Sequence, residues 1–152
     1  MSEKRWSVET LSRAHPRIAI DSNVLIYLLE EDGPRADRAA ELVDAIEAGR
    51  IVGILSTVGL TEILTGPARV GDGPRFEQTA DEVRSLGLRL VSVDVEIAKD
   101  AAWIRGAHGL STADAIHLAS ARAAGATLFI TNDRRIKRTA RLEVAYLDEM
   151  TA

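Results

Sequence analysis

Short apolar runs alternate with helix-like segments along most of this chain, and this alternation limits the fold more than any other feature. The runs span residues 18–20, 51–56, 88–93 and 128–130. Segments with apolar residues at helical spacing separate them, and no two-residue hairpin turn joins any pair. Strands connected through helices pair in parallel, so the sequence predicts an α/β fold with helices on both faces of a sheet.

The predicted helices have recognisable starts and stops. Pro34 suits a first helical turn, and Gly49 suits the position just after a helix. The dipeptide Gly66-Pro67 is expected to end the third helix, and residues 71–74 are expected to form a loop. The expected helices are 23–29, 34–48, 57–65, 76–86, 95–107 and 111–124, with a possible fifth edge strand at 144–147.

One compact domain is expected, because 152 residues with 46% hydrophobic content can bury a substantial core. Residues 1–16 form a polar N-terminal extension with a short helix near residues 8–14, and Trp6 is available to dock on the body. Residues 17–152 form the domain. No apolar run reaches the roughly 18 residues of a membrane span, so we expect a cytoplasmic protein without a membrane partner.

Several kinds of site are excluded by composition and motif. The chain has no Cys, which rules out disulfides, thiolate metal sites and a Cys nucleophile. The pair Gly71-x-Gly73 lacks a third glycine, and GxxxxGK[ST], GxSxG and HExxH do not occur. A net charge of -4 argues against a broadly basic nucleic-acid binder, although a basic edge beside an acidic site stays possible.

Four carboxylates share one kind of position, at or just after the carboxyl end of a predicted strand or in the first turns of the next helix. They are Asp21, Glu62, Asp114 and Asp133. Each alone has an ordinary explanation as a helix cap, a solvated helix position or a turn residue. Together they would meet at one sheet edge. Two carboxylates about 4 Å apart repel by roughly 4 kcal/mol at an effective dielectric near 20, so such a cluster needs a cation.

Hard oxygen ligands favour Mg²⁺ or Mn²⁺, and an acidic site that holds such an ion fits phosphodiester hydrolysis. The three histidines are isolated in sequence. His117 lies three residues after Asp114. It is interpreted as a packed histidine, or as one that contacts a metal-binding residue without binding the metal itself, rather than as a base. The basic run 134–141 is interpreted either as a phosphate-binding rim, with Arg134, Arg135 and Arg138 as the expected phosphate contacts, or as a solvated face.

Four stretches in this order and spacing resemble the PIN-domain nucleases: Ile18-Ala19-Ile20-Asp21-Ser22-Asn23, Leu60-Thr61-Glu62-Ile63-Leu64, residues 111–119 (STADAIHLA) and Thr131-Asn132-Asp133. The resemblance covers residues 17 to about 147. In size and layout the chain is similar to the VapC toxins of bacterial toxin–antitoxin pairs. Two features depart from the family pattern, namely the longer N-terminal extension and Ser111, which stands where a basic residue is common.

The resemblance implies a three-layer αβα fold with a five-stranded parallel sheet of order 3-2-1-4-5. It implies a Mg²⁺- or Mn²⁺-dependent endoribonuclease that acts on RNA, forms a homodimer and is neutralised by a small antitoxin. Asp21, Glu62, Asp114 and Asp133 match the catalytic and metal-binding acids of the family, and Ser22, Asn23, Thr131 and Asn132 match its supporting polar positions.

Three alternatives stay open. A PIN-like nuclease could serve RNA processing outside a toxin–antitoxin pair. A haloacid-dehalogenase-like phosphatase would also have an aspartate after its first strand, but it normally has a second acid two residues later, where this chain has Asn23. A non-catalytic RNA-binding module would keep the fold, yet all four acids are present here.

Overall fold

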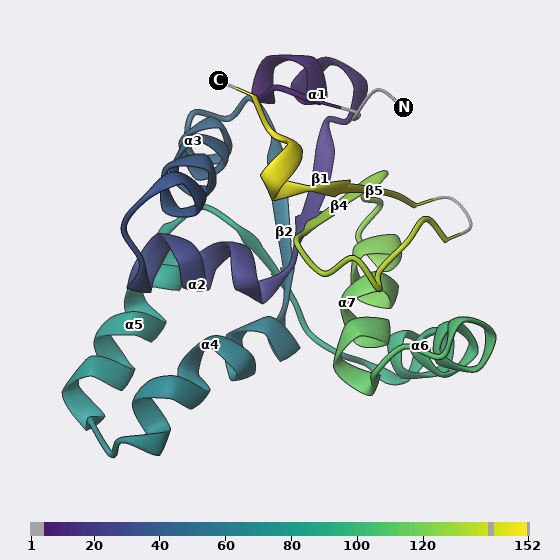
Figure 1. Cartoon of the computed structure of the whole chain (residues 1–152). Coiled ribbons are helices and arrows are strands. Elements are labelled where there is room, and N and C mark those ends of the chain that lie inside the picture. Colours follow the sequence, from purple (N-terminus) through teal and green to yellow (C-terminus); the bar gives the residue numbers. More distant parts are fainter. Residues whose placement is uncertain (1–4, 140–141, 152) are drawn as a thin grey trace.

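A single parallel sheet organises the protein, whose computed structural model describes residues 5–139 and 142–151. The five strands lie in the order β3-β2-β1-β4-β5, and each neighbouring pair is parallel (Figure 1). The α/β class and the strand order expected from the family resemblance are confirmed. The strands are β1 (Arg17–Ile20), β2 (Val52–Ser56), β3 (Arg89–Val91), β4 (Leu128–Thr131) and β5 (Glu143–Tyr146).

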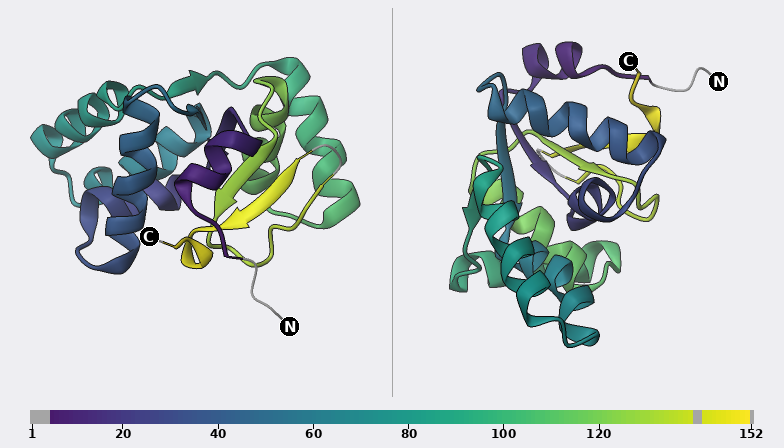
Figure 2. Two further views of the ribbon diagram at one scale, coloured as in Figure 1. Left: turned by 90° about the horizontal axis from the view of Figure 1, so that it is seen from above. Right: turned by 90° about the vertical axis from the view of Figure 1, so that its left-hand side faces the viewer.

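Helices connect β1 to β2, β2 to β3 and β3 to β4, and they cover the sheet on both faces (Figure 2). None of the helices in the described ranges combines the length and the apolar content needed to cross a bilayer. The helices are α1 (Val8–Ala14), α2 (Ser22–Glu30), α3 (Pro34–Glu47), α4 (Thr57–Arg69), α5 (Gly73–Ser85), α6 (Val95–His108), α7 (Thr112–Ala123) and the 3₁₀ turn η1 (Leu147–Glu149).

Alternate side chains of β1 divide the core into two halves. Ile18 and Ile20 point to the side covered by helices α1 to α5, whereas Ala19 points to the side covered by α6 and α7. All three side chains are at most 2% exposed. Such burial on both faces is typical of a central parallel strand and explains why this run is apolar without alternation.

The carboxyl ends of β1 and β4 lie side by side at the middle of the sheet. Ile20 pairs with Ile130, and the amide of Asp21 donates to the carbonyl of Ile130 at 2.9 Å. The chain enters α2 directly after β1 and a turn directly after β4. The residues that follow these two strands are therefore close in space although about 110 positions separate them in sequence.

The expectation that Gly66-Pro67 ends the third helix is wrong, because α4 continues through Pro67 to Arg69. Pro67 lies in the last turn and is buried, so its ring adds to the packing even though it cannot donate the hydrogen bond that a helical residue makes four residues back. Gly71, with φ of 69°, stops the helix instead. Its amide donates to Ala68 O, and the next amide donates to Pro67 O, as in a Schellman motif.

The loop expected at residues 71–74 is also shorter than predicted, because α5 begins at Gly73 rather than near Phe76. Asp72 caps this helix, and its carboxylate accepts from the amide of Arg75 at 3.0 Å. Pro74 occupies the first turn, where its lack of an amide proton does not matter. The tight connection packs α5 against α4 as a helical pair (Figure 1).

The N-terminal segment packs on the body of the protein. The expected helix is present as α1, and the expected docking of Trp6 is confirmed, with 8% of this residue exposed. Trp6 forms a parallel bridge with Met150, and its Nε1 donates to Tyr146 O at 2.9 Å. Leu11 is buried in the same half of the core, so residues 5–16 contribute apolar contacts to it.

Candidate metal centre

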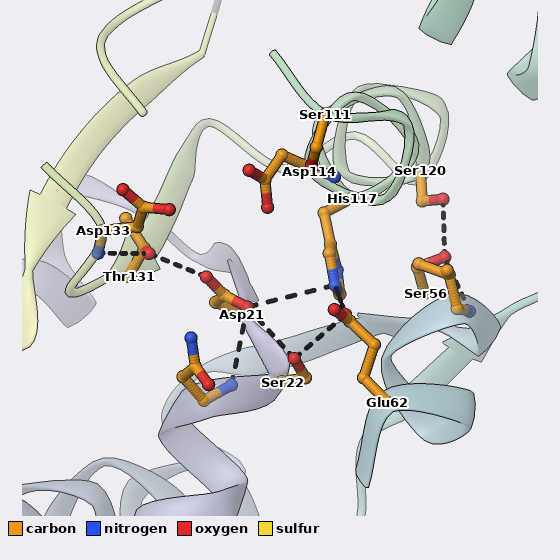
Figure 3. Close-up of polar contacts among 12 residues, drawn as sticks. Asp21, Ser22, Ser56, Glu62, Ser111, Asp114, His117, Ser120, Thr131 and Asp133 are labelled. Atoms are coloured by element: carbon orange, nitrogen blue, oxygen red, sulfur yellow. Dashed lines mark hydrogen bonds and ion pairs between the residues drawn. The ribbon is translucent and has the colours of Figure 1, made fainter. Parts of the chain in front are cut away.

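Asp21 follows β1 and lies at the centre of the candidate site (Figure 3). Only 3% of the residue is exposed. Oδ2 accepts from Thr131 Oγ1 at 2.8 Å, and Oδ1 accepts from Ser22 Oγ at 3.2 Å. Among the described residues, no Lys or Arg forms an ion pair with this carboxylate, and His117 Nε2 is 3.9 Å from Oδ1. The carboxylate is thus buried without a cationic side chain to neutralise it.

Asp21 is also the N-cap of α2, and capping is the ordinary structural role expected of an acid at this position. Oδ1 accepts from the amide of Asn23 at 3.5 Å. The cap and the candidate site therefore use the same carboxylate, because the strand ends where the helix begins. The helix N-terminus directs its partial positive charge towards Asp21.

Glu62 reaches the site from the second turn of α4. Its Oε1 accepts from His117 Nε2 at 2.6 Å and from Ser22 Oγ at 3.0 Å. The hydrogen bond from His117 is the main reason why the pKa of Glu62 is lowered, against an opposing effect of burial. Ser22 thus lies between two carboxylates, and its single proton can serve only one of them at a time.

Asp114 comes from the first turn of α7, and its carboxylate faces the space between this helix and the end of β4 (Figure 3). Ser111 caps the helix and accepts from the amide of Asp114 at 3.1 Å. Burial is the main cause that raises the pKa of Asp114, and the negative charges of Asp21 and Asp133 add to it. The pKa of Asp114 is therefore raised in part by the negative charge of the neighbouring acids.

Asp133 follows β4, and its carboxylate forms an ion pair with Arg135. The Arg135 guanidinium donates to both oxygens, with Nη2 at 2.7 Å from Oδ2 and Nε at 3.0 Å from Oδ1. These hydrogen bonds lower the pKa of Asp133. Oδ1 also accepts from the amide of Arg135 at 2.9 Å, so Asp133 is a turn residue as well.

The tightest group of potential ligand atoms comes from Asp21, Glu62 and His117, whose atoms all lie within 4.8 Å of one another. Asp114 and Asp133 belong to no group of this kind among the described residues. The structure thus brings ligand atoms of two of the predicted acids within 4.8 Å of each other and leaves the other two outside this group. His117 was expected as a packed or supporting histidine, and it is buried in direct contact with Glu62.

The supporting polar residues divide into two sets. Ser22 and Thr131 donate to the carboxylate of Asp21, and Thr131 Oγ1 also accepts from the amide of Asp133 at 3.0 Å. Asn23 contributes its backbone amide. The side chain of Asn132 points elsewhere: it donates to Asp148 Oδ1 at 3.2 Å and accepts from the amide of Asp148 at 3.0 Å, which joins the turn after β4 to η1.

A buried serine pair, which the sequence analysis did not single out, holds α4 and α7 together at the site. Ser120 Oγ donates to Ser56 Oγ at 3.0 Å, and Ser56 Oγ accepts from the amide of Val58 as the N-cap of α4. Gly59 lies one turn further along α4, where a Cβ would be only 3.0 Å from His117 Cε1. These small residues allow the close approach that brings Glu62 to His117.

The basic run after Asp133 begins with a turn, and Arg141 lies outside the described residues. Arg134 pairs with Glu149 at 2.6 Å and stacks over the ring of Tyr146 at 4.0 Å. Arg135 pairs with Asp133. Arg138 is exposed. Two of the three expected phosphate contacts are therefore already engaged by acidic side chains.

The donor chemistry of the site fits a hard divalent cation. Asp21 is buried without a Lys or Arg partner among the described residues, and burial together with the charges of Asp21 and Asp133 raises the pKa of Asp114. A divalent ion would remove this repulsion, and carboxylate oxygens are the ligands that Mg²⁺ and Mn²⁺ prefer. Glu62 adds a partly exposed carboxylate at the mouth of the site.

Sequence comparison assigns the chain to a family. The profile of the PIN domain matches residues 18–142, and the chain belongs to this family. The match covers both central strands and the four acids. No curated protein sequence matches the chain.

Solved structures with the same fold include toxins of VapBC systems. VapBC from Salmonella typhimurium bound to DNA gives a TM-score of 0.70 at 16% identity, covering 86% of this chain and 98% of that chain. VapBC2 from Rickettsia felis, bound to a fragment of its promoter, gives 0.69 at 15% identity with the same coverage. VapC20 from Mycobacterium tuberculosis, a toxin that cleaves the sarcin-ricin loop, gives 0.60 at 21% identity over 74% of this chain and 86% of that chain.

Proposed function

We propose that the protein is a divalent-metal-dependent endoribonuclease and the toxin of a type II toxin–antitoxin pair. The observation that carries this proposal is Asp21, a buried carboxylate without a Lys or Arg partner among the described residues, placed beside Glu62 at the carboxyl edge of the central strands. Membership of the PIN family and the fold shared with VapC toxins support it. They lend no support to a haloacid-dehalogenase-like phosphatase.

In the proposed site Asp21, Glu62, Asp114 and Asp133 hold Mg²⁺ or Mn²⁺. The ion would supply positive charge at the attacked phosphate and would activate a water for attack. Thr131 fixes the orientation of Asp21 through its hydroxyl group, and the hydroxyl group of Ser22 lies between Asp21 and Glu62 and can donate to either. We include Arg134, Arg135 and Arg138 as contacts to flanking phosphates of RNA, since without them the acidic site would repel a polyanion.

Cleavage of a model RNA tests the proposal. We expect cutting with Mg²⁺ or Mn²⁺, none in EDTA, and products with 5′-phosphate and 3′-OH ends, because a water-derived nucleophile does not need the RNA 2′-OH. Asp21→Asn should abolish cutting, while Asp81→Asn, which changes an exposed acid on α5, should not. Products with 2′,3′-cyclic phosphate that persist in EDTA would contradict the proposal.

The antitoxin partner is part of the same proposal, because VapBC structures are among those that share the fold. Expression of the chain alone should arrest growth, and co-expression of the product of an adjacent small reading frame should relieve the arrest. A nuclease of RNA processing outside a toxin–antitoxin pair would cut RNA in vitro but would show no such relief.

A homodimer is also proposed. Trp103 on α6 is 81% exposed, and the same helix contributes Ala102 and Gly106 to an apolar groove against α7. An exposed tryptophan beside a groove lined by small residues is typical of a surface that another chain covers. Light scattering after gel filtration would measure the mass of the particle directly.

A further inference from the structure

We propose that His117 is a positioning residue: its Nε2–H holds Glu62 Oε1 in place and leaves Oε2 of the same carboxylate available to the cation. This inference rests on the proposed metal-dependent function. Two donors, His117 Nε2 and Ser22 Oγ, converge on Oε1 at 2.6 and 3.0 Å. No hydrogen bond to Oε2 is found among the described residues. One oxygen of Glu62 is therefore held by the protein, and the other is free to bind.

The proton on His117 can be assigned from its neighbours. A carboxylate only accepts hydrogen bonds, so the ring nitrogen that faces Glu62 must carry the hydrogen. The other nitrogen, Nδ1, is buried and has no partner among the described residues. A hydrogen on Nδ1 would leave a buried donor unsatisfied, which is more costly than an unsatisfied lone pair on a weak acceptor. The neutral tautomer with its hydrogen on Nε2 fits both sides of the ring.

The ring of His117 is fixed by what surrounds it. Only 1% of the side chain is exposed. Gly59 of α4 lies so close that a Cβ there would be 3.0 Å from Cε1. On β4 the ring of Phe129 lies 6.1 Å away between centroids and is tilted by 48°. A side chain enclosed in this way keeps one orientation, and a fixed donor orients the acceptor that it holds.

Two roles for His117 must be separated, because Nε2 also lies within the tight group of potential ligand atoms. As a ligand, Nε2 would need its lone pair and would lose the hydrogen bond to Glu62. As a positioning residue, it keeps the hydrogen and acts only through Glu62. The 2.6 Å distance to Oε1, against 3.9 Å to Asp21 Oδ1, favours the second role.

Two amide variants distinguish these roles. In His117→Gln the side-chain nitrogen can reach the position of Nε2 and donate to Glu62, and this nitrogen has no lone pair for a metal. Gln could bind the cation only by turning its oxygen inward, and it would then lose the hydrogen bond to Glu62. In His117→Asn the nitrogen reaches only the position of Nδ1, which has no acceptor. We expect Gln to keep Mn²⁺ affinity within about threefold and Asn to lose roughly 10- to 100-fold, the usual effect of removing a group that orients a ligand. Titration calorimetry with Mn²⁺ measures both.

A third comparison removes Glu62, the hydrogen-bond partner of His117. In a Glu62→Ala background, His117→Asn should cause no further loss of Mn²⁺ affinity, because the histidine then has nothing to orient. A further loss in that background would make His117 a ligand and would overturn the proposal. Equal losses for His117→Gln and His117→Asn in the native background would also overturn it, while the proposed nuclease function would stand.

A measurement on the unchanged protein covers the case in which a variant does not fold. Long-range ¹H–¹⁵N correlation spectra in EDTA report which ring nitrogen carries the hydrogen. We expect Nε2–H and an unprotonated Nδ1 for His117, and the opposite tautomer would overturn the proposal. If the wild-type protein binds no Mn²⁺, the proposed function fails and this inference fails with it. If instead the wild-type protein binds Mn²⁺ and substitutions of His117 do not change the affinity, only the inference about His117 fails.

Discussion

Asp114 should destabilise the metal-free protein when it is charged. Its pKa is raised from 3.8, so the folded state binds this proton more readily than the unfolded state does. The associated stability is present below pH 3.8 and is lost as the pH rises through the folded-state pKa. Asp114→Asn removes a charge that is unfavourable at pH 7, and in EDTA it should raise the melting temperature by a few degrees, as about 1 kcal/mol corresponds to roughly 2–4 °C.

The pH dependence provides the control for this prediction. Well below pH 3.8 both side chains are neutral in the folded and the unfolded state, so the difference in melting temperature between the variant and the wild type should shrink as the pH falls. Asp81→Asn, on the exposed side of α5, should show no comparable gap at either pH. A variant that melts below the wild type at pH 7 in EDTA would mean that Asp114 makes a favourable contact in its charged form.

Arg135 should compete with a cation for Asp133. The guanidinium binds both carboxylate oxygens, and Asp133 can serve as a ligand only after Arg135 moves away. We expect Arg135→Ala to raise Mn²⁺ affinity severalfold in calorimetric titrations. Arg138→Ala removes a positive charge from the same exposed segment without touching Asp133, and it should change the affinity less. Equal gains would show that only the overall charge matters.

At the residue level, sequence reasoning could place the acids but not their contacts. Asp21 and Asp133 follow the two central strands, and this placement could be predicted because parallel strands end at one edge. His117 could be placed one turn after Asp114. Its contact with Glu62, 55 residues away, depends on how closely α4 approaches α7. That approach is set by Gly59 and a serine pair, whose importance appears only once both helices are packed.

Gly71 should matter more to α4 than its exposed position suggests. With φ of 69° it adopts the left-handed conformation that L side chains rarely adopt. Gly71→Ala should lower the free energy of unfolding by about 1 kcal/mol, because the added Cβ is strained there. Gly73→Ala is the matched control, since nothing lies within 4 Å of its Cβ position and its φ is not positive. Chemical denaturation of both variants measures the difference.

If both alanine variants unfold at the same denaturant concentration, Gly71 does not end the helix in the way described. The comparison also explains a wrong prediction about this element. Gly66-Pro67 looked like a stop because proline ends helices in general. In the structure Pro67 sits in the last turn, and the capping bonds at Gly71 decide where the helix ends. Local composition cannot decide whether α4 ends at Gly66-Pro67 or at Gly71, because this depends on the burial of Pro67.

For the whole molecule, a divalent ion should stabilise the fold. An ion that binds only the folded state adds about 2.7 kcal/mol at a hundred times its dissociation constant. On the scale of roughly 2–4 °C per kcal/mol, the melting temperature should rise by about 5–11 °C with saturating Mn²⁺ relative to EDTA. Asp21→Asn should remove most of the increase. Identical melting temperatures for the wild type with and without Mn²⁺ would show that the acids do not form a metal site.

The architecture was more predictable than the site because it depends on pattern rather than on contact. The apolar runs of β1 and β4 and the helical segments between the strands suffice for an α/β class. The strand order came from the family resemblance, since periodicity does not say which strands are neighbours. The pairing of Arg135 with Asp133 was missed although the two residues are close in sequence. A turn that brings a guanidinium onto its own carboxylate is a matter of backbone conformation.

The pairing of Trp6 with Tyr146 and Met150 has a consequence for synthesis on the ribosome. These partners are about 140 residues further along the chain. At roughly 5–20 residues per second, Trp6 is added to the chain about 7–28 s before Tyr146. During that interval the surface of the core that Trp6 later covers is open in every nascent chain. Closure of this side of the protein is therefore timed by translation, and a chain that stalls before Tyr146 cannot complete it.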